Sequence, residues 1–448
     1  MGEERASWRR LEAMMGDSQD LILELVREYH RERERSRRFV PGETLVMPSG
    51  ADLNEDDRVA LVEAALTLRI AAGPSALALE RELGRTLRRR KVHLTNSGSS
   101  ANLLALTALT QPEIGAGRLK PGDEIVTVAA GFPTTVNPIL QNQMVPVFVD
   151  VELGTYNTTA ERVAEAIGPR TRGIMIAHAL GNPFPAAEVA ELAAEHGLFF
   201  VEDNCDGVDA KYRGRPTGTF GDFSTVSFYP AHHLTMGEGG CVTTDRPRLA
   251  RIVESLRDWG RDCWCEPGDC DTCGKRYTQQ FGDLPYGYDH KYTFSHVGYN
   301  MKTTDLQAAL GLSQLKRLPE FGAARRRNWR RLREGLDGLP GLLLPEPTPG
   351  GDPSWFGFVI TVTADAPFDR DEIVAHLEDR RIGTRMLFAG NLTRQPAYRG
   401  REYRVSGSLA NSDAITARTF WIGVFPGLTD EMIDYVIATV RDFVTSRR

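Results

Sequence analysis

The stretch SFYPAHHLTMGEGG, residues 227–240, links two β-rich runs, STVSFYP and GGCVTTD. It carries two adjacent histidines, His232 and His233, and ends in glycines, a composition that indicates a strand followed by a tight loop. The stretch contains no lysine. The whole chain has only seven lysines against 47 arginines, so a stretch without lysine is not unusual. The absence is informative only if a histidine stands at a position where a lysine is expected.

From about residue 92, short β-rich runs alternate with helical stretches. The segments that show this alternation are HLTNSGSSANLLALTAL, DEIVTVAA, VPVFVDVE, RGIMIAHAL, AAEVAELAAEHGLFFVED, STVSFYP and GGCVTTD. Strands separated by helices predict βαβ units and a mostly parallel sheet, so the fold class is α/β.

A second region starts near the arginine-rich helical stretch 305–337. The cluster LPEPTPGGDPS separates that stretch from WFGFVITVT and from later helical patterns, which predicts a smaller α+β domain. At the other end, residues 19–38 have helical spacing and mixed charges, typical of a leading surface helix. We therefore predict an N-terminal helical segment over 1–44, a large domain over 45–318 and a small C-terminal domain over 319–448.

Composition excludes several classes of protein. The 448 residues are 41% hydrophobic and 25% charged, which is typical of a globular enzyme, and the net charge of −6 argues against nucleic-acid binding. The N-terminus is charged, and no apolar run approaches the ~18 residues that a membrane span needs. We expect a cytoplasmic protein without a membrane partner.

Three places have the chemistry of a cofactor site. Gly98 and Ser99 lead from a strand into a helix, whose N-terminal N–H groups can bind a phosphate, although such residues also simply cap helices. Asp203 ends an apolar strand and could pair with a protonated ring nitrogen or could be a turn residue. Phe132, after another strand, could stack on a ring or belong to the core.

Together these stretches resemble the sugar aminotransferase family (DegT/DnrJ/EryC1/StrS), which acts on nucleotide-linked keto sugars. The resemblance implies a pyridoxal-phosphate-dependent transferase fold of type I, like that of aspartate aminotransferase, and a homodimer. It also implies roles for single residues: His232 at the position of the Schiff-base lysine, Ser227 and the turn of Gly98 and Ser99 at the phosphate, Asp203 at the ring nitrogen, Phe132 stacked on the ring, and Asn300 reaching the partner's phosphate. Asp206 and Lys302 stand where the family commonly has glutamine and arginine.

A histidine at the lysine position implies a different reaction. Histidine cannot form the stable imine, so the resemblance implies pyridoxamine 5'-phosphate (PMP) held without a covalent bond. His232 then becomes a proton shuttle, a role that suits histidine because the side chain of this residue type exchanges protons near neutral pH. The amine would condense with the C4 ketone of a sugar, and proton abstraction by His232 would expel the C3 hydroxyl.

Four of the six cysteines fall in RDCWCEPGDCDTCGK, residues 261–275. A cytoplasmic chain is not expected to form disulfides, so this cluster suggests a metal centre, either zinc or iron–sulfur. There are 57 residues between Cys205 and Cys263, one between Cys263 and Cys265, and seven between Cys265 and Cys273. The spacing resembles that of the iron–sulfur hexulose-3-dehydrases, which implies a [2Fe–2S] cluster on these four cysteines, with Cys241 and Cys270 as non-ligands.

The predicted function is C3 deoxygenation of a nucleotide-linked 4-keto-6-deoxy sugar. PMP-dependent dehydration would be followed by two one-electron reductions, fed by an external reductase or a ferredoxin- or flavodoxin-type donor. A cluster-free dehydratase and a non-catalytic zinc- or cofactor-binding protein are the alternatives, and CDP and TDP substrates both stay open. Arg385 and Arg394 could meet the diphosphate or be surface residues.

Overall fold

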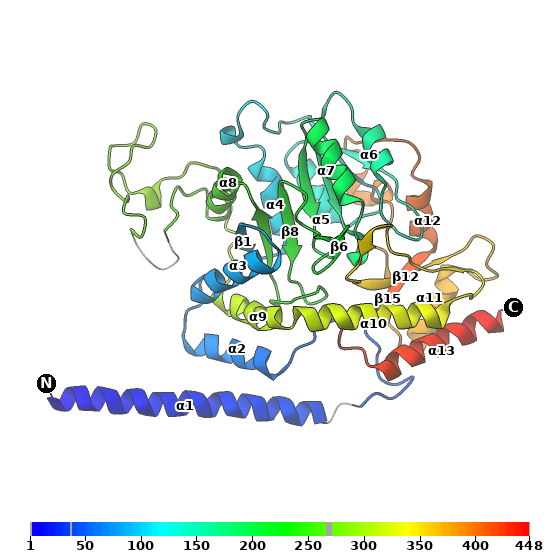
Figure 1. The fold of residues 1–448 in the computed structure, drawn as a ribbon, viewed down its shortest axis with the longest axis horizontal. Helices are drawn as coiled ribbons and strands as arrows, with labels where there is room; N and C mark the ends of the chain where they lie inside the picture. Colours follow the sequence, from blue (N-terminus) through cyan, green and yellow to red (C-terminus); the bar gives the residue numbers. More distant parts are fainter. Residues whose placement is uncertain (1, 36–37, 266–270, 448) are drawn as a thin grey trace.

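An eight-stranded sheet forms the centre of the protein (Figure 1) in a computed structural model, which describes residues 2–35, 38–265 and 271–447. Every neighbouring pair is parallel except the two pairs that β9 makes. The sheet is therefore mostly parallel, as predicted. In spatial order the strands are β1 (Lys91–Thr95), β9 (Gly240–Thr244), β8 (Phe223–Ser227), β5 (Phe199–Asp203), β4 (Thr171–Ala177), β2 (Glu124–Val128), β3 (Val145–Val149) and β14 (Arg404–Val405).

Helices cover both faces of this sheet, so its strands are buried on both sides and their sequences are almost continuously apolar. Consecutive residues of β2 show the two faces: Ile125 packs in one core cluster and Val126 in the other. The first cluster also contains residues of α4 (Gly98–Ala108), α5 (Pro133–Gln141) and α8 (Pro247–Arg257). The second contains residues of α6 (Ala160–Ala166) and α7 (Ala186–Glu195).

A second, antiparallel sheet of four strands packs with helices into its own core, which confirms a smaller α+β region. Its strands are β10 (Leu342–Leu343), β12 (Gly357–Val362), β15 (Thr419–Gly423) and β13 (Arg385–Met386). Residues of α10 (Leu318–Leu336), α11 (Arg370–Asp379) and α13 (Asp430–Ser446) complete that core. The other elements are α2 (Glu55–Leu66), α3 (Pro74–Thr86), α9 (Asp305–Lys316), α12 (Ala410–Arg418) and a small sheet of β11 (Gly351–Asp352), β6 (Lys211–Tyr212) and β7 (Arg215–Pro216).

The domain bounds 1–44, 45–318 and 319–448 stay a prediction, and two contacts cross them. Val46 forms a β-bridge with Ile382 and packs in the core of the four-stranded sheet. In the other direction, β14 leaves the C-terminal region to pair with β3 at the edge of the large sheet.

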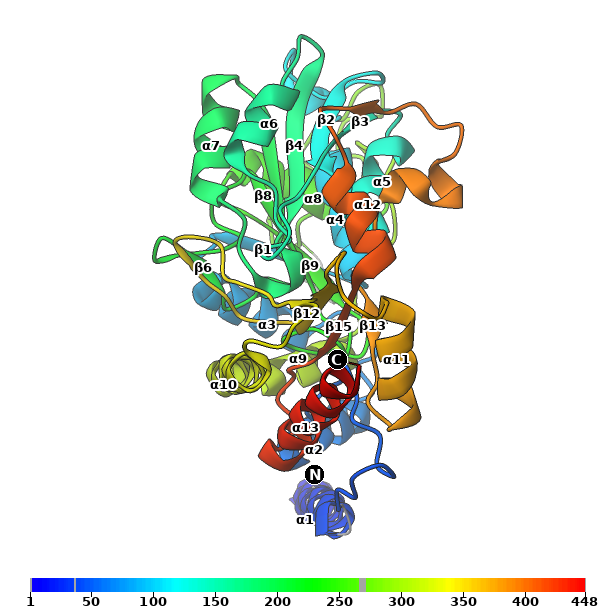
Figure 2. The ribbon, with the colours of Figure 1, turned by 90° about the vertical axis from the view of Figure 1, so that its right-hand side faces the viewer.

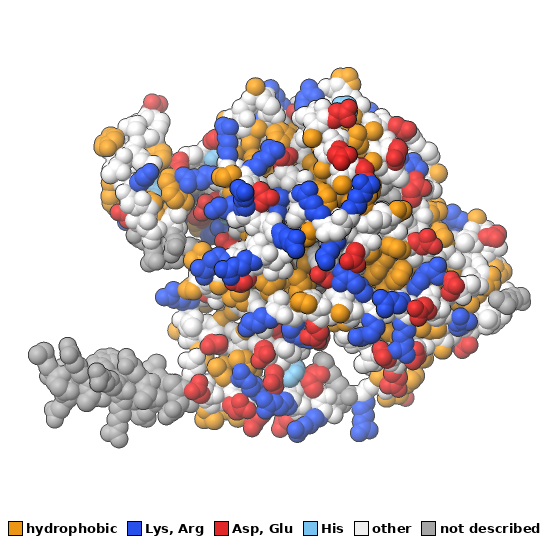
Figure 3. All heavy atoms as spheres, in the orientation of Figure 1, with side chains coloured by type: hydrophobic (Ala, Val, Ile, Leu, Met, Phe, Trp, Pro, Cys, Tyr) orange, Lys and Arg blue, Asp and Glu red, His pale blue; other side chains and the backbone are white. Residues whose placement is uncertain are grey.

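The leading helix is longer than predicted: α1 spans Gly2–Arg35. This helix lies along α2 and apart from the two sheets (Figures 1 and 2). Arg31 of α1 forms an ion pair with Glu55 of α2 at 3.0 Å. Among the described helices, none combines the length and apolar character needed to cross a membrane. The face seen in Figure 3 carries basic and acidic side chains interspersed over most of its area.

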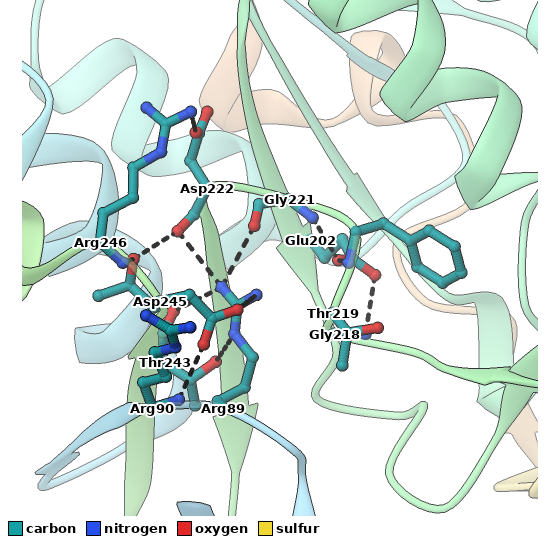
Figure 4. Close-up of polar contacts among 12 residues, drawn as sticks. Arg89, Arg90, Glu202, Gly218, Thr219, Gly221, Asp222, Thr243, Asp245 and Arg246 are labelled. Atoms are coloured by element: carbon teal, nitrogen blue, oxygen red, sulfur yellow. Dashed lines mark hydrogen bonds and ion pairs between the residues drawn. The ribbon is translucent and has the colours of Figure 1, made fainter.

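Two buried charges fix the strand on which the candidate site depends (Figure 4). The Glu202 carboxylate accepts backbone hydrogen bonds from Gly218, Phe220 and Gly221 at 2.5–2.7 Å. Arg89 donates to the carbonyl oxygens of Gly221 and Asp222 at 3.2 and 3.3 Å. Because Glu202 is the residue before Asp203, these contacts hold the carboxyl end of β5 in place.

His93 on β1 makes the stability of the fold depend on pH. Burial lowers its pKa to about 3, whereas an unfolded histidine titrates near 6.5. Between these values the unfolded chain binds a proton that the folded chain does not, so stability is lost as the pH falls. We expect His93 to contribute a loss of about 1.4 kcal/mol per pH unit below about pH 6.5. Urea unfolding at pH 7.5 and 5.5 measures this, and His93→Gln should reduce the slope; an unchanged slope would contradict the assignment.

Candidate functional site

The Asp203 carboxylate lies at the carboxyl end of β5 and is buried. Its Oδ2 accepts hydrogen bonds from Asn102 Nδ2 at 2.8 Å and Thr135 Oγ1 at 2.7 Å, and its Oδ1 accepts one from the Cys205 backbone at 3.2 Å. These bonds hold the carboxylate in one orientation. Sequence reasoning missed Asn102 and Thr135, although both lie near the N-termini of helices that follow strands of the same sheet, which is where such partners are expected.

The turn at the start of α4 packs directly against the end of β8. A Cβ atom at Gly98 would lie 2.5 Å from Cβ of Ser227 and 3.0 Å from Sγ of Cys205, so only glycine fits there. Ser97 caps the helix by accepting a hydrogen bond from the Ser100 backbone at 3.0 Å. Ser99 is exposed in the first turn. The N-terminal turn of a helix beside a serine hydroxyl is suited to a phosphate group.

We expect Gly98→Ala to weaken this site because the added methyl group displaces Ser227. Overpacking of this kind costs about 1–3 kcal/mol. Thermal unfolding and titration with PMP should show a less stable protein with weaker cofactor binding. Gly117→Ala, where nothing lies within 4 Å of the new Cβ, is the matched control. Equal behaviour of the two variants would contradict the assignment of this turn.

His232 lies in the loop between β8 and β9, beside Asp206 on the loop after β5. His232 Nδ1 is 3.2 Å from Asp206 Oδ1, close enough for an ion pair, but its angle does not suit a linear hydrogen bond. Both side chains are largely buried, at 16% and 12% exposure. Arg325 donates to the His232 carbonyl oxygen at 3.0 Å and so holds the loop backbone. The structure thus brings together two predicted residues, His232 and Asp206, with the carboxylate beside Nδ1 of the histidine.

His233 has a different environment from its neighbour. It is buried, its Nε2 lies 2.7 Å from the Ser354 carbonyl oxygen, and burial lowers its pKa well below the usual value. A neutral, buried and hydrogen-bonded histidine serves the packing of the loop. Of the two adjacent histidines, the geometry therefore favours His232 for proton transfer.

The other predicted residues lie nearer the surface. Phe132 precedes α5, is 52% exposed, and contacts Phe388 edge-on at a centroid distance of 6.4 Å. Asn300 is exposed and accepts a hydrogen bond from Lys302 at 2.8 Å. Arg394 forms a two-point ion pair with Asp413, which supports its interpretation as a surface residue. Arg385 is exposed on β13.

Three of the predicted metal ligands lie together in the segment after α8, which leaves the body of the protein in Figure 1. Cys265 Sγ and Cys273 Sγ are 3.6 Å apart, and Cys263 joins Cys265 and His290 in a group whose ligand atoms lie within 4.8 Å of one another. Burial raises the pKa of Cys263 to about 11. For Cys265 the effect of burial is outweighed by hydrogen bonds, first from the Cys273 backbone, and its pKa falls to about 6. His290 was not predicted, since a lone histidine 17 residues after Cys273 gives no spacing signal.

Cys205 borders Gly98 beside the cofactor turn, and its role as a metal ligand stays a prediction. Among the described residues, the group that could hold a metal consists of Cys263, Cys265 and His290, and includes neither Cys205 nor Cys273. Burial and the Asp203 charge raise the pKa of Cys205 well above the usual value. Cys241 is buried on β9, as expected of a non-ligand, and Cys270 lies outside the described residues.

Residues 52–441 match the model of the DegT/DnrJ/EryC1/StrS aminotransferase family. The chain therefore belongs to this family. It is 66% identical, over 96% of its length and 93% of the relative, to dTDP-4-dehydro-2,6-dideoxy-D-glucose 3-dehydratase of Saccharopolyspora spinosa. It is 52% identical, over 94% of its length and 97% of the relative, to lipopolysaccharide biosynthesis protein RfbH of Salmonella typhimurium.

Solved structures agree with this assignment. GDP-4-keto-6-deoxy-D-mannose-3-dehydratase of Escherichia coli with bound hydrated PLP matches with a TM-score of 0.79 at 26% identity, over 89% of this chain and 100% of that one. A structure of GDP-4-keto-6-deoxymannose-3-dehydratase with bound GDP-perosamine also gives a TM-score of 0.79, at 26% identity, over 88% of this chain and 100% of that one. These matches confirm the predicted family, the aminotransferase-like fold and an enzyme of the sugar 3-dehydratase type.

Proposed function

We propose that the chain is a PMP-dependent 3-dehydratase of a nucleotide-linked 4-keto-6-deoxy sugar, with a dTDP-linked 2,6-dideoxy sugar as its substrate. The observation that carries the reaction type is His232, paired with Asp206, at the loop position where the resemblance places a lysine. The 66% identity to a dTDP-4-dehydro-2,6-dideoxy-D-glucose 3-dehydratase supports the substrate. We propose further that the enzyme is cytoplasmic and works as a homodimer, in which exposed Asn300 reaches the partner's cofactor.

The residues at the carboxyl ends of the strands fit a pyridoxamine cofactor. The cradle formed by Gly98 and Ser227 has room only because residue 98 lacks a Cβ, and the first turn of α4 provides N–H groups for a phosphate. In this proposal Asp203, held by Asn102 and Thr135, would pair with a ring nitrogen, and exposed Phe132 would stack on the ring. When bound, the cofactor supplies an amine and an electron sink.

His232 moves the proton in this proposal. Asp206 faces Nδ1, so Nε2 is the free nitrogen and acts as the base toward the substrate–cofactor complex. Asp206 also stabilises the imidazolium that forms when Nε2 takes a proton. Nε2 can then return the captured proton to the leaving hydroxyl group.

We expect Asp206→Asn to lower kcat about 10- to 10³-fold, within the range of positioned acid–base catalysis, with little change in KM. The amide keeps the size of the side chain but removes the charge that faces Nδ1. Steady-state kinetics measure both constants. Asp209→Asn, in the same loop but paired with Arg326, is the control. An Asp206→Asn protein with raised KM and unchanged kcat would show that Asp206 binds substrate instead.

The proposed reaction ends with reduction at C3 through a [2Fe–2S] centre on the loop cysteines. Thiolates are the ligands that iron–sulfur clusters use, and Cys263, Cys265 and Cys273 lie together on a projecting segment that an external electron donor can approach. We propose a reductase or a ferredoxin- or flavodoxin-type protein as that donor. The alternative without a cluster leaves this grouping of cysteines unexplained.

Purification without oxygen tests this function. We expect a coloured protein with iron and sulfide in equal amounts, whose visible absorption bleaches on reduction, and stoichiometric binding of added PMP. A colourless protein without iron that still dehydrates the sugar would favour the cluster-free dehydratase. A protein that binds zinc and shows no turnover would favour the non-catalytic alternative.

A further inference from the structure

We propose that Phe356, the residue before β12, is a positioning residue for His232 and holds the imidazole in the orientation that proton transfer requires. The inference rests on the proposed function, in which His232 is the base. It gives the C-terminal region a part in the site that no sequence pattern indicated.

The imidazole of His232 has an aromatic neighbour. Its ring centroid lies 5.3 Å from that of Phe356, and the two ring planes are tilted by 47°. The Phe356 side chain is buried, at 7% exposure. A phenyl ring carries no polar group, so this contact restrains the imidazole by shape and does not compete for its two nitrogen atoms.

Asp206 alone does not fix the orientation of the imidazole. Its Oδ1 lies 3.2 Å from His232 Nδ1, but the angle does not suit a linear hydrogen bond, so the carboxylate does not define the plane of the ring. A side chain restrained at one atom can still turn about its χ angles. The packed ring of Phe356 removes that freedom because it fills space into which the imidazole would turn. Asp206 thus supplies the charge and Phe356 the orientation.

Phe356 is itself held on two sides. Its ring contacts Trp421 of β15 edge-on at a centroid distance of 5.5 Å, and its backbone N–H donates to the Leu180 carbonyl oxygen at 2.8 Å. The Ser354 N–H donates to the carbonyl oxygen of Gly181 at 3.1 Å. This close approach requires a glycine, since a Cβ at Gly181 would overlap the Ser354 carbonyl oxygen and φ there is +83°. Phe356 is therefore a rigid support, as a positioning residue must be.

The residues just before this phenyl ring also hold the backbone of the histidine loop. The Ser354 carbonyl oxygen lies 2.7 Å from His233 Nε2. The Trp355 carbonyl oxygen accepts a hydrogen bond from Arg325 at 3.2 Å, and the same guanidinium donates to the His232 carbonyl oxygen at 3.0 Å. Because a guanidinium presents its N–H groups in a planar fork, it fixes the two backbones that it joins relative to each other. The backbone and the ring of the base are thus both located by one short segment.

The test measures the proton-transfer step by itself. The protein is incubated in D₂O with PMP and dTDP-4-keto-2,6-dideoxyglucose but no reductant, and exchange of the PMP methylene hydrogen is followed by mass spectrometry. We expect Phe356→Leu to slow this exchange about 10- to 10²-fold, the effect of a misplacement of about 1 Å, with little change in the affinity for PMP.

Phe358→Leu is the matched control. Phe358 lies two positions further on, in β12, and is fully buried, but it packs in the core of the four-stranded sheet. Its replacement should lower thermal stability at least as much as Phe356→Leu does and leave the exchange rate close to that of the wild type.

A second variant and a spectrum guard against simple misfolding. Phe356→Met fills the space with a flexible, unbranched side chain, so it should keep the fold and lose the rigid ring. Nitrogen-15 NMR of histidine-labelled protein, with the His232 signals identified by their loss in His232→Asn, should show one ring tautomer in the wild type and averaged tautomers in both Phe356 variants.

The proposal is overturned if Phe356→Leu or Phe356→Met keeps the wild-type exchange rate and spectrum, or if Phe358→Leu slows exchange as much as they do. Failure of the proposed function looks different: the wild-type protein itself would show no exchange that depends on His232. The NMR comparison of the same variants would then still decide whether Phe356 orients the imidazole.

Discussion

Replacing His232 by lysine is expected to abolish dehydration, lowering its rate at least about 10²- to 10⁴-fold, the range that positioned acid–base groups contribute. The lysine amine can bond covalently to the aldehyde form of the cofactor, which an imidazole cannot, and it would draw the enzyme toward amine transfer. Borohydride trapping followed by mass spectrometry should find the cofactor attached to residue 232. The wild-type protein should carry no such adduct.

His232→Asn separates the two effects of that substitution. It removes the base without adding an amine, so we expect the same loss of dehydration and no covalent adduct. His233→Asn, by contrast, should act mainly on stability, since His233 is buried against the Ser354 carbonyl oxygen. Undiminished deoxygenation by either His232 variant in the presence of PMP would show that His232 is not the proton shuttle.

Replacing Cys263 by serine is expected to bleach the protein and to lower net 3-deoxygenation at least about 100-fold. A [2Fe–2S] centre needs four protein ligands. A serine hydroxyl binds iron more weakly than a cysteine thiolate, so the iron at that position becomes labile. Proton abstraction precedes electron transfer, so His232 should still exchange the PMP methylene hydrogen with D₂O at close to the wild-type rate. Iron analysis, product assay and mass spectrometry of the cofactor measure the three quantities.

Cys241→Ser provides the matched control, since Cys241 is buried on β9 in the large sheet. It should keep iron and turnover. Circular dichroism shows whether the Cys263→Ser substitution disturbs the rest of the fold. A Cys263→Ser protein that retained both its iron and its full turnover would contradict the role of the loop cysteines.

The sequence predicted the architecture well because local patterns decide it. Strands such as VPVFVDVE are apolar on both faces and alternate with helices, which leaves few arrangements other than a parallel sheet. Asp203 could be proposed as a site residue for the same reason, since ligands of such sheets bind at the carboxyl ends of strands. Ser227, by contrast, was indicated only by the family resemblance. The prediction did not extend the leading helix to Gly2, because the apolar residues at helical spacing that indicated it were those of residues 19–38.

Residues that act through contacts distant in sequence could not be predicted. Asn102 donates a hydrogen bond to Asp203, which is 101 positions away in the sequence, and Arg325 donates one to the carbonyl oxygen of His232, which is 93 positions away. Both residues lie within helices, α4 and α10, and only tertiary packing gives them these partners. His290 is the sharpest case: its relation to the cysteines depends on how the segment after α8 folds back, which spacing does not encode.

One measurement tests the central claim most directly. The purified protein is incubated without oxygen with PMP, a chemical or protein reductant and dTDP-4-keto-2,6-dideoxyglucose, and the nucleotide sugar is analysed by mass spectrometry and NMR. We predict a product that is lighter by one oxygen atom, with C3 as a methylene group, and none when PMP is omitted. Recovery of the unchanged sugar, or of a 4-amino sugar that keeps its C3 hydroxyl, would contradict the account.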